Sequence, residues 1–188
     1  MNTRVPEEVF EIGILDRDYH DRLLTGLDKW TEIAGIPEEF VWSKLSRYCK
    51  DEDLAWVREL REDKSHGMIY TGDSNVEMKM MAITGACLRN YIDARFMTVQ
   101  QVLSRLMDDD MPDASVVLIP NFCMEGVAGS DGSGSVLPWQ SAKLLGWLYS
   151  RLAKGLKTVL YVSSMKTLEK HYGEAMAKHL KNHYVIVQ

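Results

Sequence analysis

Residues 67–90 combine the residue types and the spacing of a phosphate-binding loop: a short apolar run ends at Gly72, and a helix-like stretch follows. In such loops a glycine-rich turn cradles the phosphates with backbone N–H groups, and a lysine contacts them from the start of the helix. Aligned on Gly72, the pattern G-x-x-x-x-G-K-[ST] puts Glu77 at the second glycine and Met78 at the lysine. Lys79 then falls at the Ser/Thr position. The sequence keeps the frame of a nucleotide site without its phosphate-binding residues.

These replacements disfavour phosphate binding for separate physical reasons. Glu77 brings a negative charge beside a polyanion, and its Cβ stands where close approach of the backbone needs glycine. Lys79 comes one position late, so on a helix its side chain points about 100° away from the required direction. The loop is therefore predicted not to bind nucleotide, and a working site that uses Lys79 is the alternative.

Two other groups of residues could bind a cation. His179 and His183 are four residues apart, so both can lie on one helix face, but no acid is placed to complete a ligand set. The acidic run DDDMPD, at 108–113, is more typical of a solvated turn between a helix and a strand. We therefore expect surface residues in both places and no metal site.

Composition places the chain among globular proteins. Its 188 residues suit one domain of average size, with 46% apolar and 26% charged residues. The longest apolar runs are far too short to cross a bilayer, and the first residues are acidic where a secretory signal would be basic. Cys49, Cys87 and Cys123 stand far apart, which argues against a disulfide framework or a zinc site. We expect a cytoplasmic protein without membrane contact.

Charge is unevenly distributed along the chain. Residues 143–188 carry eight Lys and Arg against two Glu, whereas the whole chain has a net charge of −5. Such a basic segment can contact a phosphate backbone or an acidic partner. A solvated surface is the simpler interpretation, because no aromatic residues alternate with the basic ones as in a nucleic-acid platform. Any DNA contact is expected to be weak and to involve 143–188.

The first 35 residues form a segment separate from the rest. Apolar residues recur in it at steps of three and four, among them Leu23, Leu27 and Trp30. This spacing predicts an amphipathic helix over about 16–34. Its apolar stripe either packs on the chain's own core or docks on a partner.

From Gly67 onward, short apolar runs alternate with helical stretches. Alternation of this kind predicts parallel βαβ units, and near-continuous apolar strands indicate helices on both faces of the sheet. We expect an α/β three-layer sandwich with a central, mainly parallel five-stranded sheet, and ligands beyond the carboxyl ends of its strands. The expected strands are 67–72, 94–99, 115–122, 157–164 and 183–188, and the expected helices are 50–60, 76–90, 99–107, 138–154 and 166–181, the last interrupted near Gly173. A Gly/Ser-rich stretch at 126–138 is expected to be a flexible loop.

Several segments follow one another in a particular order: IPEEFVWSKLSRY, GMIYTG, RFMTVQQVLSRL, SVVLIPNF, LPWQSAKLLGWLYSRLAKGLKTVLYVSS and LEKHYGEAMAKHL. This order resembles the AAA+ domain of the DnaC-type helicase loaders, the group that includes DnaI and IstB. The resemblance covers about residues 36–188 and rests on element order and scattered positions. It implies an AAA+-like domain at 36–188, preceded by a helical segment at 1–35.

The resemblance also implies where the magnesium-binding and sensor residues should stand. The acidic pair that holds Mg²⁺ and polarises the attacking water should follow the strand at 115–122. Pro120 and Asn121 occupy those places, and neither can act as a carboxylate. Ser163 and Ser164 match a polar sensor strand, although serine is common at strand ends for turn reasons alone.

By the same resemblance, the arginine box of the family corresponds to GEAMAKHL, with Ala175 and Lys178 at its two arginine positions. Neither residue offers the planar, permanently charged fork of an arginine finger. The phosphate-binding residues, the magnesium-binding acids and the arginines are thus all absent from the expected positions. We expect a degenerate, non-hydrolysing ATPase remnant with no cofactor.

The function implied by this resemblance is that of a non-catalytic AAA+-like protein of DNA replication, of phage or mobile-element origin. Its partner would be a replicative helicase or an AAA+ helicase loader, held as adaptor, loader or inhibitor through Leu23, Leu27 and Trp30. AAA+-like surfaces can also assemble with copies of the chain. Two alternatives stay open: an active loader that binds ATP and Mg²⁺ with an atypical P-loop, and a DNA-binding accessory protein that uses the basic C-terminal region.

Overall fold

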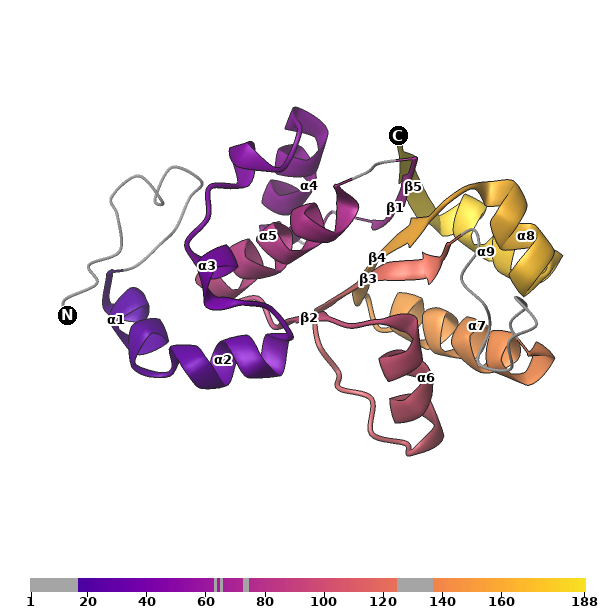
Figure 1. Cartoon of the computed structure of the whole chain (residues 1–188), viewed down its shortest axis with the longest axis horizontal. Helices are drawn as coiled ribbons and strands as arrows, with labels where there is room; N and C mark the ends of the chain where they lie inside the picture. The colour runs from indigo at the N-terminus through magenta and orange to yellow at the C-terminus, as the bar shows by residue number, and fades with distance from the viewer. Residues whose placement is uncertain (1–16, 63, 65, 73–74, 125–136) are drawn as a thin grey trace. The chain divides into compact units, whose positions relative to one another are not determined.

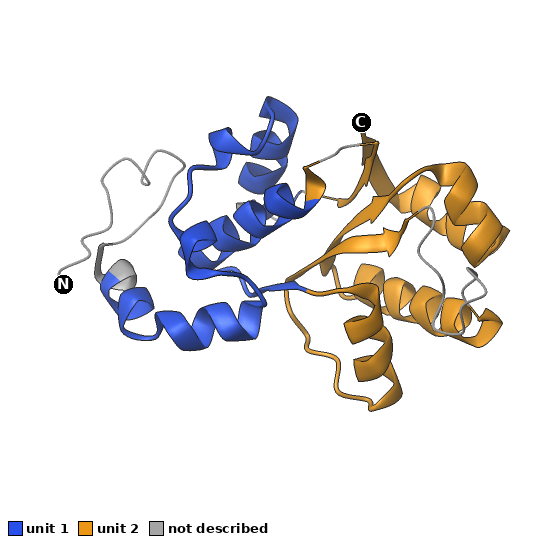
Figure 2. Ribbon diagram, viewed as in Figure 1, with its two compact units in different colours: residues 1–65, 77–96 blue, residues 66–76, 97–188 orange. Residues whose placement is uncertain are grey.

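The computed structural model describes residues 17–62, 64, 66–72, 75–124 and 137–188 (Figure 1). The chain divides into two compact units (Figure 2). Unit 1 comprises residues 1–65 and 77–96, and unit 2 comprises residues 66–76 and 97–188. The boundary expected between 35 and 36 stays a prediction. Most of the expected Gly/Ser-rich loop lies outside the described residues.

Unit 1 is mainly helical. Its elements are α1 (Arg17–Thr25), α2 (Leu27–Ala34), α3 (Glu38–Val41), the 3-10 helix η2 (Leu45–Arg47), α4 (Asp51–Arg61), nearly all of α5 (Val76–Arg89) and the short strand β2 (Ala94–Phe96). The single helix predicted over 16–34 is wrong, because α1 and α2 meet at Gly26, whose φ of −114° and ψ of 18° depart from helical values. Glycine is a poor helix former, which favours a break at this residue.

Helix α5 packs closely on the chain around α3. A Cβ on Gly85 would lie 2.1 Å from the carbonyl oxygen of Phe40, so only glycine fits at this approach. The guanidinium of Arg89 donates a hydrogen bond to the carbonyl oxygen of Val41. These two contacts fix the position of α5 within unit 1, and with it the direction of the side chains on its first turns.

Unit 2 has α/β architecture. Its strands are β1 (Gly67–Thr71), β3 (Val116–Cys123), β4 (Lys157–Val162) and β5 (Tyr184–Val187), and its helices are α6 (Val99–Met107), α7 (Pro138–Ala153), α8 (Met165–Tyr172) and α9 (Glu174–His183). Strand β4 pairs in parallel with β3 and β1, and β1 pairs in parallel with β5. With β2 at one edge, the order of the sheet is β2-β3-β4-β1-β5. The predicted α/β class with a five-stranded, mainly parallel sheet is confirmed.

The strands of unit 2 form the centre of its core. The first five residues of β3 are buried. This agrees with its near-continuous apolar run, which predicted a strand covered by helices on both faces. Helix α6 begins where predicted, because Thr98 and Gln101 cap it reciprocally, each side chain accepting a hydrogen bond from the backbone N–H of the other. The predicted interruption near Gly173 is also confirmed, since its φ of 88° separates α8 from α9. Among the described residues, no helix has both the length and the apolar character needed to cross a membrane.

Candidate functional site

The turn after β1 keeps the glycine on which the phosphate-loop frame was aligned. Gly72 has a φ of 72°, in the left-handed region that side-chain-bearing residues rarely adopt. A Cβ at this residue would meet no atom within 4 Å, so its backbone conformation, not crowding, is what calls for glycine here. The two residues that follow, 73–74, lie outside the described part of the chain.

The helix that follows this turn directs its lysine into unit 1. Lys79 is buried, and its Nζ lies 3.3 Å from Oδ2 of Asp53 in an ion pair whose side chains are 4% and 1% exposed. Oδ2 of Asp53 also accepts a hydrogen bond of 2.8 Å from the backbone N–H of Lys50, at the start of α4. Glu77 and Met78, by contrast, are exposed. The lysine nearest to the phosphate-binding position is thus held by a buried carboxylate.

The carboxyl end of β3, where the family resemblance predicts a magnesium-binding acid, is irregular. Ile119 pairs with Leu160, but the next paired residue, Cys123, is opposite Val162, so β3 bulges between the two. Pro120 lies in this bulge, which suits a residue that has no N–H to donate to a sheet. No carboxylate stands at this point of the strand.

Asn121, also in the bulge, makes side-chain contacts with the start of α6. Its Oδ1 accepts a hydrogen bond of 2.9 Å from the backbone N–H of Val99. Its Nδ2 donates one of 3.1 Å to Oε1 of Gln100. Because the first N–H groups of a helix have no partner within the helix, Asn121 acts as an additional cap for α6.

The two serines expected on a sensor strand follow β4. Ser164 caps α8, since its Oγ accepts a hydrogen bond of 3.0 Å from the backbone N–H of Thr167. Ser163 donates its backbone N–H to the carbonyl oxygen of Cys123 at 2.8 Å. Its buried hydroxyl has no hydrogen-bond partner in the described part of the chain. Ala175 and Lys178, at the expected arginine positions, are exposed on α9. The structure therefore gives Ser164 a helix-capping role, which was not predicted from the sequence.

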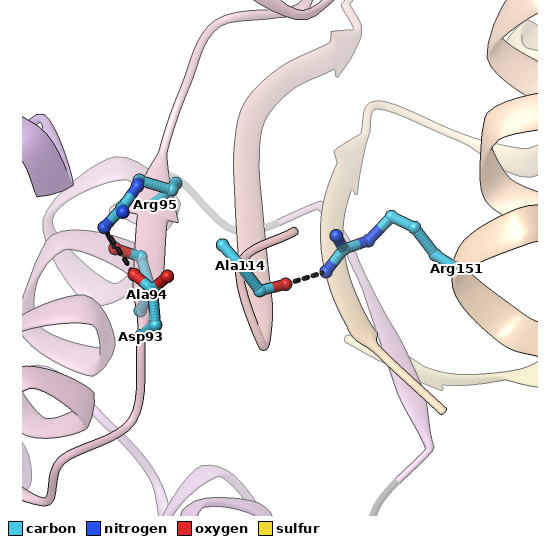
Figure 3. A network of polar contacts seen from close by, with 5 residues as sticks. All are labelled: Asp93, Ala94, Arg95, Ala114 and Arg151. Atoms are coloured by element: carbon cyan, nitrogen blue, oxygen red, sulfur yellow. Dashed lines mark hydrogen bonds and ion pairs between the residues drawn. The ribbon is translucent and has the colours of Figure 1, made fainter. Parts of the chain in front are cut away.

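The basic C-terminal region contains one arginine that is not available to a ligand. Arg151 is 2% exposed and donates from Nη2 to the carbonyl oxygen of Ala114 at 3.0 Å (Figure 3). Its Nε donates to Oγ1 of Thr158 at 2.9 Å, which ties α7 to the start of β4. Burial lowers the pKa of Arg151 to about 10, which still leaves it charged at neutral pH. Arg151 is thus a structural cation of unit 2.

The acidic run at 108–113 is partly neutralised by neighbouring cations. Asp113 and Lys154 form an exposed ion pair of 2.8 Å, and this lysine lowers the pKa of the Asp113 carboxyl. Asp110 pairs with Arg105 at 3.2 Å. No cluster of three or more metal-binding side chains occurs in the described ranges. The expectation of a solvated turn here agrees with these contacts.

A cavity of about 360 Å³ lies in unit 2, beside the amino ends of β3 and β4 and therefore away from the edge where nucleotides bind such sheets. Its walls combine Trp147 and other apolar side chains with basic and acidic ones. Two of its cations, Lys154 and Arg151, already have the partners described above. The cavity is not part of the predicted nucleotide site.

The apolar stripe predicted for the N-terminal segment is divided by burial. Leu23 and Leu27 are only 2% and 7% exposed, so they contribute to the core. Trp30 is 45% exposed and Ile33 is 39% exposed, both on α2. A role in partner binding stays a prediction for all three residues of the stripe, and Trp30 is the one whose side chain can reach a partner without a rearrangement.

Comparisons with known proteins identify relatives of the fold only. No protein-family model matches the sequence, and a search of curated proteins finds no match. Among solved structures, a DNA replication initiation factor superposes with a TM-score of 0.59 over 81% of this chain, at 6% identity. DnaA from Aquifex aeolicus bound to AMPPCP gives 0.56 over 77% at 8% identity, and the replication initiator DnaA bound to AMPPCP and single-stranded DNA gives 0.55 over 77% at 7%.

The chain spans about half the length of each of these structures, 50%, 50% and 49% respectively. Membership of the DnaC, DnaI and IstB group stays a prediction. At identities this low, the likeness concerns the fold and not the chemistry of the site. It shows that the chain has an AAA+ P-loop NTPase-like fold, similar to that of DNA replication initiators such as DnaA.

Proposed function

We propose that the chain is a non-catalytic AAA+-like protein of DNA replication, which binds a replicative helicase or an AAA+ helicase loader as adaptor, loader or inhibitor. The observation that carries this proposal is the buried ion pair between Lys79 and Asp53. A lysine that contacts phosphates must be able to reach them. Moving Lys79 to a nucleotide would leave the Asp53 carboxylate buried without its cation, which is strongly unfavourable.

The end of β3 supports the same conclusion from the side of the metal ion. Mg²⁺ binds through carboxylates, phosphates and water, and Pro120 and Asn121 supply no carboxylate. The amide of Asn121 is moreover engaged with the start of α6. Hydrolysis is also accelerated by an arginine finger that stabilises the charge of the transition state, and the exposed Ala175 and Lys178 do not replace one. No nucleotide cofactor is proposed.

Calorimetric titration of the full chain with ATP and Mg²⁺, together with a phosphate-release assay, tests this part of the proposal. We expect no binding in the low micromolar range and no hydrolysis above a buffer control. Met78→Lys alone should not restore activity, because the carboxylates at β3 would still be absent. Tight ATP binding that Lys79→Met abolishes would instead establish the alternative, an active loader with an atypical P-loop.

The partner is the second part of the proposal. We expect capture of a purified replicative helicase or of an AAA+ loader by the immobilised chain in the absence of ATP. Failure to capture either protein, under conditions in which the chain is folded and monodisperse, would contradict the proposed role. A phage or mobile-element origin and a cytoplasmic location fit an adaptor of this kind and belong to the same proposal.

DNA binding through 143–188 is the other candidate function. In its favour stand the exposed lysines of this region, such as Lys166, Lys170 and Lys178. Against it stand the burial of Arg151 and the pairing of Lys154 with Asp113. Fluorescence anisotropy with single- and double-stranded oligonucleotides at two salt concentrations tests it, because phosphate contacts weaken steeply with salt. Nanomolar binding that persists at high salt would contradict the expectation of weak contact.

A further inference from the structure

The helix α9 carries a histidine whose surroundings differ from the sequence-based expectation. His179 was expected at the surface, but it is only 2% exposed. Its position explains the difference, since Met176 and Leu180 on the same helix are also buried and lie three residues before it and one after it. The imidazole lies against Tyr149 of α7, with ring centres 4.2 Å apart, and against Tyr184 of β5 at 6.0 Å. All of these residues belong to unit 2.

Both ring nitrogens of His179 are buried, and neither has a hydrogen-bond partner among the residues that the structure describes. A neutral imidazole has one N–H donor and one lone-pair acceptor, and buried polar atoms of this kind nearly always find partners. Such a pair of unpaired atoms on one ring calls for an explanation, and a bound metal ion or a water molecule is one that fits. The rings of Tyr149 and Tyr184 are inclined to the imidazole by 56° and 66°, and neither tyrosine supplies a hydrogen bond to it.

The second histidine of the helix stands at the distance that a shared metal ion requires. The rings of His179 and His183 are 5.1 Å apart between centres and inclined by 48°. A zinc ion lies about 2.0–2.1 Å from an imidazole nitrogen, hence about 3.2 Å from the ring centre, so two rings on a tetrahedral ion are separated by about 5.2 Å. The spacing of four residues places both histidines on one helix face, as in helical zinc-binding motifs.

The end of α9 adds a favourable electrostatic environment. His183 is the last residue of the helix. The carbonyl groups of a final helical turn carry a partial negative charge, which favours a cation at that end. Desolvation, followed by the neighbouring His183, lowers the pKa of His179, which favours the neutral imidazole that binds metals.

We propose that His179 and His183 form a two-histidine site for a divalent transition metal ion of the zinc class. Water completes the coordination, because among the described residues no third histidine, cysteine or acid joins the pair. Imidazole ligands select zinc, copper or nickel over magnesium and calcium, which prefer oxygen. The open positions leave the ion able to accept one further ligand from solution. This site is separate from the degenerate nucleotide loop and does not depend on the proposed function.

Titration of the chelator-treated full chain with Zn²⁺ by calorimetry, and with Co²⁺ by visible absorption, tests the proposal. We expect one equivalent to bind at micromolar concentrations, with a rise in the thermal midpoint and the visible bands of tetrahedral or five-coordinate Co²⁺. Mg²⁺ should give no signal. His183→Ala, at an exposed residue, should weaken Zn²⁺ binding about tenfold or more. His171→Ala, a histidine of α8 outside the pair, is the matched control and should bind as the unaltered chain does.

The histidine ring signals in a nitrogen-detected NMR spectrum give a second readout. Both His179 and His183 should shift on addition of one equivalent of Zn²⁺, whereas His171 should not. Two results would overturn the proposal: no Zn²⁺ binding below about 100 μM, a concentration that marks only weak affinity, or unchanged binding by a folded His183→Ala variant. The latter would mean that other groups, such as the thiols, hold the metal.

Discussion

Removing the cation from the buried ion pair tests the central structural argument for a non-catalytic protein. In Lys79→Met the side chain is unbranched and one atom shorter, and it loses its charge, which leaves the Asp53 carboxylate buried beside an apolar neighbour. Both partners are almost completely buried, so screening by solvent is small. Breaking one side of such a pair costs about 3–5 kcal/mol of the free energy of unfolding. For a chain of this size the thermal midpoint should fall by about 6–20 °C.

Urea denaturation followed by circular dichroism measures this change, and a double-mutant cycle attributes it to the pair. Asp53→Asn keeps an oxygen that can accept the N–H of Lys50 but removes the charge. The double variant Lys79→Met/Asp53→Asn should therefore be less unstable than the sum of the two single variants. Lys154→Met, which breaks an exposed ion pair, is the control and should leave the urea midpoint unchanged.

The outcome separates the two main functional hypotheses. If Lys79→Met unfolds at the same urea concentration as the unaltered chain, Lys79 does not stabilise unit 1, and the reasoning against a phosphate-binding lysine fails. A lysine kept for ATP would show the opposite pattern, with no change in stability and a loss of nucleotide affinity. Measuring both quantities on one variant therefore decides whether this side chain serves the fold or a ligand.

Three further predictions concern single side chains. Asn121→Ala should lower the free energy of unfolding by about 1 kcal/mol in urea denaturation, because the N–H of Val99 loses its hydrogen-bond acceptor. Asn121→Asp keeps an acceptor, so it should retain most of that stability, and it should gain no ATPase activity. The pKa of His179 is lowered from 6.5 in the folded chain, so the free energy of unfolding should be highest above pH 6.5 and fall as the pH drops below it. His179→Leu should flatten this pH dependence in urea titrations between pH 7.5 and 5.5. Trp30→Ala should abolish partner capture without changing the thermal midpoint, whereas Leu27→Ala should destabilise the chain by about 2–5 kcal/mol; equal capture by the Trp30 variant would exclude docking at α2.

Local sequence patterns were sufficient to predict most elements of unit 2. The bounds predicted for helix α6, 99–107, agree with the structure, where Thr98 and Gln101 cap its start. The break at Gly173 and the strands β1, β3 and β4 follow from similarly local signals, namely glycine and continuous apolar runs. The division at Gly26 was missed because the apolar repeat continues across it and outweighed one glycine in the pattern.

The residues around the candidate site were harder to interpret, because their partners are distant in sequence. Asp53 is one of three acids in the first turn of α4, a pattern that favours a helix start whichever acid is buried. Only the packing of α5 against the preceding helices selects this acid as the partner of Lys79. His179 is different, because its burial follows from a local pattern: Met176 and Leu180, on the same helix, are also buried.

Lys79 and Asn121, the side chains nearest to the expected phosphate and magnesium positions, both make contacts within the protein. Lys79 neutralises a carboxylate that also anchors the start of α4, and Asn121 caps α6 from the bulge of β3. Replacing either residue alone removes a stabilising contact without creating a phosphate or magnesium ligand. Using either side chain for a nucleotide or its Mg²⁺ would therefore first break a contact that stabilises the fold. Under the proposed non-catalytic role, this coupling gives a physical reason for the two residues to be kept, because Lys79 and Asn121 then stabilise the fold and do not serve a ligand.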